Sequence, residues 1–143
     1  MFIGEYQHAT DDKGRLAIPA KFRATLGERA IVTRGLDRCL FVFSVNDWAE
    51  LAKKLAAMPL ARADARAFGR HMLAGAMEVE MDGQGRILLP EYLRTYASIG
   101  KTAIVAGLYT RIEIWNDAAW QKYKEQTESD SDDIAEKLTE LGI

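Results

Sequence analysis

Two stretches of this sequence repeat one pattern: Asp11-Asp12-Lys13-Gly14-Arg15-Leu16-Ala17-Ile18-Pro19 and Asp82-Gly83-Gln84-Gly85-Arg86-Ile87-Leu88-Leu89-Pro90. A constant offset of 71 residues, from Asp11 to Asp82, relates the two copies. One Asp, one Gly, the Arg and the Pro are identical between them, and the same offset relates Arg23 to Arg94 just beyond. This repetition indicates a duplication, and therefore two halves with similar folds.

Each copy carries the residues of a tight turn between two short strands. An aspartate side chain bonds its own downstream backbone, and glycine accepts the positive φ that such a turn requires. Residues 2–10 and 15–18, on either side of the first turn, are compatible with β-strands. We therefore expect a hairpin whose tip carries Lys13, Gly14 and Arg15, followed by a short helix that Pro19 opens.

The rest of the chain repeats the same order of elements. After the first turn we expect strands at residues 30–33 and 40–43 and a helix that Asn46 caps. After the second turn we expect strands at residues 101–106 and 111–115 and a helix that Asn116 caps. Each half is thus predicted to be β-β-α-β-β-α. The predicted divisions are a first repeat at residues 1–58, a linker helix at 59–75, a second repeat at 76–127 and an acidic tail at 128–143.

The linker is predicted to be a helix with two distinct faces between residues 60 and 75. Arg62, Arg66 and Arg70 are spaced by four and are expected to share one face, with apolar side chains on another. Such a basic face is either simply solvated or a contact for phosphate or for acidic groups of a neighbouring subunit.

Charge is distributed unevenly along the chain. The formal net charge is −2 over 143 residues. From Glu125 onward, however, there are seven acidic residues and a single basic one, Lys137, so the preceding residues 1–124 carry a net charge of +4. Ile134, Leu138 and Leu141 fall at helical spacing within the acidic tail, which is therefore either a short amphipathic helix or a frayed end. A mildly basic body is compatible with nucleic-acid binding.

The sequence offers little for catalysis, metal binding or a cofactor. His8 and His71 do not stand at metal-ligand spacing, and Cys39 is the only cysteine, which excludes an internal disulfide. No phosphate-binding loop, dinucleotide fingerprint or nucleophile elbow is present. Asp11 and Asp82 could be imagined as a catalytic carboxylate pair, but each is better explained as the residue that organises its turn. We expect no catalytic residues, no metal and no cofactor.

No membrane association is expected. The chain has no run of about eighteen apolar residues that could span a bilayer. Its N-terminus, from Met1 to Glu5, lacks the basic and apolar regions of an export signal. A cytoplasmic protein, associated with the nucleoid, is the expectation.

The chemistry of the two turns suits nucleic-acid binding. The expected DNA-contacting residues are Lys13, Gly14 and Arg15 in the first turn and Gln84, Gly85 and Arg86 in the second. Arginine can bind phosphate bidentately, or guanine O6 and N7 in the major groove. Glycine leaves room for close approach to the backbone. The alternative is that Asp11 with Arg15, and Asp82 with Arg86, are only ion pairs that fix the turns.

These motifs resemble the MraZ family of bacterial transcriptional regulators, within the wider AbrB/SpoVT group. The resemblance rests on Met1-Phe2-x-Gly4 and on the two Asp-x-x-Gly-Arg turns with their prolines, and it covers essentially the whole chain. It implies an α+β fold, a tandem swapped-hairpin β-barrel with two pseudo-symmetric halves. It also implies a ring-shaped homo-oligomer that binds repeated operator boxes in double-stranded DNA and represses its own operon of cell-division and cell-wall genes.

The resemblance also implies roles for single residues. Arg15 and Arg86 match the principal DNA contacts, Lys13 assists them, and Asp11 and Asp82 brace the loops. Two other classes of protein stay open. One is a ring-forming scaffold, or an antitoxin-like protein, that binds a protein partner. The other is a hydrolase that uses Asp11 and Asp82.

Overall fold

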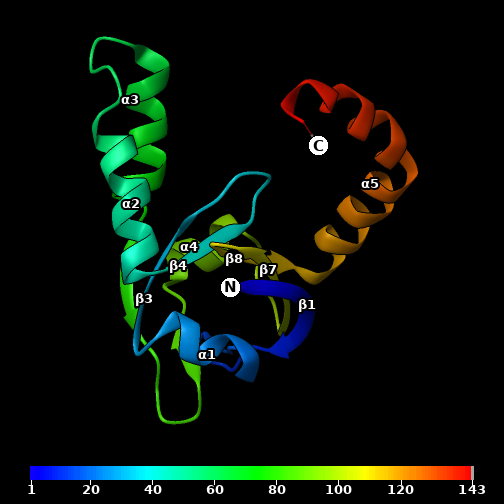
Figure 1. Cartoon of the computed structure of the whole chain (residues 1–143). Coiled ribbons are helices and arrows are strands. Elements are labelled where there is room, and N and C mark those ends of the chain that lie inside the picture. Colours follow the sequence, from blue (N-terminus) through cyan, green and yellow to red (C-terminus); the bar gives the residue numbers. More distant parts are fainter. Residues whose placement is uncertain (143) are drawn as a thin grey trace.

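The computed structural model, which describes residues 1–142, confirms an α+β fold with the same order of elements in each half (Figure 1). The first half contains β1 (Phe2–Ala9), β2 (Arg15–Ala17), α1 (Ala20–Leu26), β3 (Arg29–Arg34), β4 (Leu40–Ser44) and α2 (Val45–Ala56). The second contains β5 (Met77–Glu80), β6 (Arg86–Leu88), α4 (Glu91–Tyr96), β7 (Thr102–Tyr109), β8 (Ile112–Asn116) and α5 (Asp117–Lys137). The linker forms α3 (Ala63–Gly69) and the π-helical turn η1 (Arg70–Ala74), and a 3-10 turn η2 (Thr139–Leu141) follows α5.

The two halves exchange their strands. An antiparallel six-stranded sheet has the order β1-β7-β8-β4-β3-β5, and β2 and β6 form a separate pair. The first strand of each half thus pairs in the other half: β1 pairs with β7, from Phe2↔Tyr109 to Ala9↔Thr102, and β5 pairs with β3. The central neighbours β4 and β8 are equivalent strands of the two halves. This arrangement is the tandem swapped-hairpin topology.

The exchange corrects the local hairpin that the residue pattern predicts. Strands β1 and β2 are joined only by an isolated bridge, Thr10↔Leu16, and the second half repeats this with Met81↔Ile87. The regular ladder runs instead between β2 and β6. Each turn therefore folds back locally, but the strand that leaves it pairs with its counterpart from the other half.

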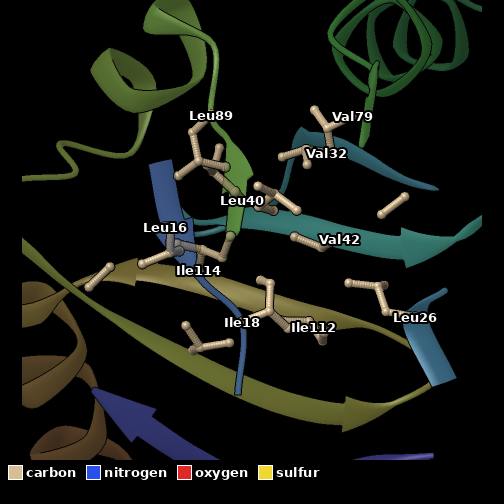
Figure 2. Packing of buried hydrophobic residues seen from close by; sticks show 14 of the residues in the cluster. Leu16, Ile18, Leu26, Val32, Leu40, Val42, Val79, Leu89, Ile112 and Ile114 are labelled. Carbon is tan, nitrogen blue, oxygen red and sulfur yellow. The ribbon is translucent and has the colours of Figure 1, made fainter. Parts of the chain in front are cut away.

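One apolar core joins both halves (Figure 2). Leu16 and Ile18 of the first half and Ile87 and Leu89 of the second are fully buried in it. A unit of about seventy residues is close to the lower limit for an independent core. Sharing one core between the halves therefore gives each of them more apolar burial than it could provide alone.

The sheet also buries its second face. Alternation along β4 places Leu40 and Val42 in the shared core, whereas Phe41 and Phe43 point to the opposite face. There, Phe43 packs with Trp48 of α2 at a ring distance of 5.6 Å, and the equivalent residue Trp120 packs on Trp115 at 5.4 Å. Helices α2 and α5 therefore both pack on this face, with α2 at the left and α5 at the right of Figure 1.

The ends of several helices differ from the prediction. Ser44 rather than Asn46 caps α2, accepting from the Asp47 backbone N–H at 3.2 Å. The predicted cap Asn116 is confirmed, since its Oδ1 accepts from the Ala119 N–H at 2.8 Å.

The linker helix is shorter than predicted. Helix α3 begins at Ala63, after Arg62, which has an extended backbone with φ −88° and ψ 128°. Arg62 therefore does not share a helical face with Arg66 and Arg70, and it pairs with Asp64 at 2.7 Å. The prediction of three arginines on one face is wrong.

Most of the acidic tail, as far as residue 142, is helical. Helix α5 continues without interruption from Asp117 to Lys137, past the start of the tail at residue 128. Among the helices of residues 1–142, none has the length and apolar composition needed to cross a membrane.

Candidate nucleic-acid interface

Asp11 organises the first turn, as its sequence position predicts. Its Oδ1 accepts hydrogen bonds from the backbone N–H groups of Lys13 at 3.0 Å and Arg15 at 2.9 Å. The main chain closes the same turn, because Gly14 N donates to Asp11 O at 3.0 Å. Gly14 has φ +87°, a backbone conformation that residues other than glycine rarely adopt.

Asp82 performs the same task in the second turn. Its Oδ1 accepts from the backbone N–H groups of Gln84 and Arg86, both at 2.9 Å. Gly85 N donates to Asp82 O at 3.0 Å, and Gly85 has φ +74°. The repeated sequence therefore produces two turns with the same hydrogen bonds, each built around its own carboxylate.

The two arginines meet at one carboxylate oxygen. Arg15 Nε lies 2.6 Å from Asp11 Oδ2, and Arg86 Nε lies 2.9 Å from Asp82 Oδ2. Arg86 also reaches across the halves, with Nη1 3.5 Å from Asp11 Oδ2. The side chains of Arg15 and Arg86 keep 36% and 25% of their surface exposed. The two turns therefore form a single composite surface, which we call the paired-loop surface.

The hydrogen bonds lower the pKa of both aspartates. For Asp11 the largest cause is the backbone N–H of Arg15, and the Arg15 side chain and the Lys13 N–H lower the pKa further. For Asp82 the equivalent groups of Arg86 and Gln84 act in the same order. Both carboxylates therefore stay ionised to a lower pH than a free aspartate does, and as anions they pair with the arginines.

A second pair of arginines clamps each turn from the opposite half. Arg94 Nε donates to Leu89 O at 2.9 Å, and Leu89 N donates to Gly14 O at 2.9 Å. A methyl group at Gly14 would lie only 2.5 Å from Arg94 Nε.

The reciprocal contact places Arg23 over Gly85. Arg23 Nε donates to Ile18 O at 2.9 Å, and Ile18 N donates to Gly85 O at 2.9 Å. Sequence reasoning assigned no role to Arg23 and Arg94, although the shared offset of 71 residues marked them as part of the repeat.

The predicted contact residues differ in accessibility. Lys13 and Gln84 are exposed at the loop tips, and Arg15 and Arg86 are half-buried. Gly14 and Gly85 are buried. The open space that we expected beside each glycine is filled by Arg94 or Arg23. The glycines therefore permit the fold of the loops and the clamp.

The histidines and the cysteine lie outside the paired-loop surface. His71 Nε2 is 2.8 Å from Gly35 O, and burial lowers the pKa of His8. Cys39 is fully buried, and burial raises the pKa of its thiol. Within residues 1–142, no three side chains of His, Cys, Asp or Glu are grouped so as to hold a metal ion.

The strand exchange and the duplicated loops define a tandem swapped-hairpin protein, with two similar halves in one chain. A family model described as "MraZ protein, putative antitoxin-like" matches residues 1–71 and again residues 72–141. The chain belongs to the MraZ family, as the sequence resemblance predicts.

Relatives are similar over their whole length. The protein named "Transcriptional regulator MraZ" of Desulforamulus reducens is 52% identical over 141 residues, which cover 99% of each chain. Proteins of the same name from Moorella thermoacetica and Alkaliphilus oremlandii are 50% and 52% identical over 143 residues, covering all of both chains. These names describe transcriptional regulators.

Proposed function

We propose that this chain is a sequence-specific regulator of transcription that binds double-stranded DNA through its paired-loop surface. The observation that carries the proposal is the convergence of Arg15 and Arg86 on Asp11 Oδ2, at 2.6 and 3.5 Å. Two guanidinium groups held together by carboxylates form a rigid, pre-oriented donor set. The names of the full-length relatives support the same class of function.

Each group in the surface has a chemical role in this proposal. Arg15 and Arg86 direct Nε to carboxylates, and Arg86 also directs Nη1 to Asp11, which leaves both terminal nitrogens of Arg15 and Nη2 of Arg86 to bind a phosphate or the O6 and N7 atoms of guanine. Lys13 adds a point charge for phosphate, and Gln84 can bond a base edge. Gly14 and Gly85 hold the loops in shape, and Asp11 and Asp82 brace them.

One subunit should bind DNA weakly. The basic side chains Lys13, Arg15 and Arg86 are balanced by Asp11, Asp12 and Asp82 in the same loops. The charges of these loop residues therefore cancel, and non-specific attraction to phosphate is small. Several linked subunits raise the effective concentration of each loop at neighbouring sites. We therefore propose a ring-shaped homo-oligomer that recognises repeated operator boxes, represses its own operon and acts at the nucleoid.

Fluorescence anisotropy with labelled DNA from upstream of the gene tests the proposal. We expect tight binding to this duplex and at least tenfold weaker binding to a shuffled duplex of equal composition. If the oligomer contacts about six to ten phosphates, the affinity for the upstream duplex should fall roughly 10³–10⁵-fold between 50 and 200 mM salt. Equal affinity for both duplexes would refute sequence-specific binding.

The description "antitoxin-like" of the matching family favours a second candidate, in which the chain binds a protein partner. Such a partner should compete with DNA if it uses the paired-loop surface. It should bind independently of Arg15 and Arg86 if it uses the acidic tail. The DNA experiment separates the two, because a pure protein binder should not distinguish the upstream duplex from the shuffled one.

A further inference from the structure

The end of α5 and the turn η2 that follows it carry an apolar stripe, which we call the tail stripe, that lacks cover. Residues 131–142 are all exposed, and the helix curves away from the sheet (Figure 1). Ile134 lies in α5, Leu138 follows the last residue of α5, and Leu141 lies in η2, with 39%, 39% and 66% of their surface exposed. An apolar stripe on one side of a helix is typical of a surface that packs against another element.

The surroundings of this stripe are strongly acidic. Asp130 lies one turn before Ile134 on the same side of the helix, and Asp133 lies beside it. Only Lys137 opposes the seven acidic residues from Glu125 onward. A partner surface for this helix should therefore combine apolar side chains with positive charge.

A groove with this composition lies between the end of α2 and the pair α3 and η1. It has a volume of about 380 Å³. Leu60, 82% exposed, stands at its edge, and Leu55, Met58 and Leu73 line it with Arg66 and Arg70. Within residues 1–142, no ion pair occupies Arg66 or Arg70, whereas Arg62 is paired with Asp64. The groove is thus apolar with a basic rim.

We propose that the acidic end of α5 of one copy docks into the groove between α2 and α3 of the next copy. The inference rests on the oligomer of the proposed function and names the surfaces that build it. Helices α2 and α5 follow the equivalent strands β4 and β8, so the pair α2 and α3 that lines the groove lies on one side of each copy and the tail on the other (Figure 1). A contact between two different surfaces repeats from copy to copy and closes into a ring when the rotation permits.

The apolar part of both surfaces distinguishes this occupant from DNA. Phosphate groups could pair with Arg66 and Arg70, but they would not cover the exposed side chains of Leu60 and Leu73. The tail stripe can cover them, while the aspartates of α5 approach the two arginines. The tail of a second copy therefore satisfies both properties of the groove.

Two single substitutions test the contact in the full chain. Leu138→Asp places a charge in the stripe, and Leu60→Asp places one at the groove. Both side chains are exposed, so neither change should disturb the core. Ser129→Asp, on the opposite side of α5, is the matched control. Light scattering coupled to size-exclusion chromatography compares each mass with the 16.0 kDa of one chain.

We expect an oligomer for the unmodified chain and for Ser129→Asp, and a monomer for each leucine variant. An equimolar mixture of the two leucine variants should form a one-to-one dimer and nothing larger. In that mixture, the intact tail of Leu60→Asp meets the intact groove of Leu138→Asp, and both remaining surfaces are defective.

Three outcomes would overturn the inference. If both leucine variants keep the mass of the unmodified chain, the ring uses other surfaces, and only this inference fails. If the mixture stays monomeric, the tail and the groove do not bind each other. If the unmodified chain is itself a monomer, the ring of the proposed function fails as well, whereas binding to the upstream duplex remains a separate result.

Discussion

Arg94 lies over Gly14, so that the second half of the chain fixes the DNA-binding loop that we propose in the first half. The Arg94 guanidinium occupies the space that a side chain at position 14 would need, and its Nε donates to Leu89 O at 2.9 Å. Arg23 and Gly85 repeat the contact in the opposite direction. The strand exchange therefore makes the shape of each loop depend on the folding of the other half.

The second loop offers a matched pair of glycine substitutions. Gly85→Ala should destabilise the protein by at least about 1 kcal/mol, because alanine at φ +74° is strained and its methyl group would collide with Arg23. Gly83→Ala should be neutral or slightly stabilising, because Gly83 has no positive φ and no neighbour within 4 Å of the added carbon. Urea unfolding of both variants measures the difference. Equal midpoints would show that the clamp does not constrain Gly85.

The clamp over Gly14 should appear as coupling between two residues. Gly14→Ala forces Arg94 aside, and Arg94→Ala removes the hydrogen bond to Leu89 O, so each alone should cost about 1–2 kcal/mol. The double variant should cost less than the sum by at least about 0.5 kcal/mol, because truncating Arg94 makes room for the methyl group. Unfolding free energies of the four proteins in this cycle measure the coupling. Additive costs would contradict the contact.

Local turn chemistry made the shape of each single loop predictable. The bonds from Asp11 to the N–H groups of Lys13 and Arg15 span two and four residues, so the sequence alone contains the whole turn. The same is true of the cap at Asn116. Ser44 and Asn46 are both good capping residues, and α2 begins directly after β4, so its cap is Ser44, two residues before the predicted one.

Contacts between the halves could not be read from the residue pattern. Strand β2 has three residues, and nothing in Arg15–Ala17 specifies β6 rather than β1 as its partner. The exchange was implied by the resemblance to the MraZ family. Arg23 and Arg94 were visible as repeated positions, but their role depends on a contact over Gly85 and Gly14 that only the folded chain creates.

The two aspartates should make the stability of the protein sensitive to acid. Because hydrogen bonds depress the pKa of Asp11 and Asp82 in the folded state, their stabilising effect is complete above the unfolded pKa of about 3.9. It is lost as the pH falls through the lower folded values. Asp11→Asn with Asp82→Asn keeps acceptors in both turns but removes the charges. Its urea midpoint should therefore fall less between pH 5 and pH 2 than that of the unmodified chain. If the urea midpoints of the two proteins fell in parallel with pH, the ionised carboxylates of Asp11 and Asp82 would not stabilise the fold.

Arg15→Ala and Arg86→Ala should each weaken binding to the upstream duplex by roughly 5- to 150-fold, since one bidentate contact to a base contributes about 1–3 kcal/mol. Thermal unfolding should change little, because both ion pairs are partly solvent-exposed. Arg62→Ala is the control, since it removes an arginine paired with a carboxylate far from the loops, and it should leave affinity unchanged.

Lys13 and Gln84 differ between the otherwise equivalent turns. Lys13→Ala should therefore reduce the salt dependence of binding, whereas Gln84→Ala should leave it intact. Anisotropy titrations at several salt concentrations measure both quantities, and unchanged affinity in the double variant of Arg15 and Arg86 would remove the paired-loop surface as the DNA contact.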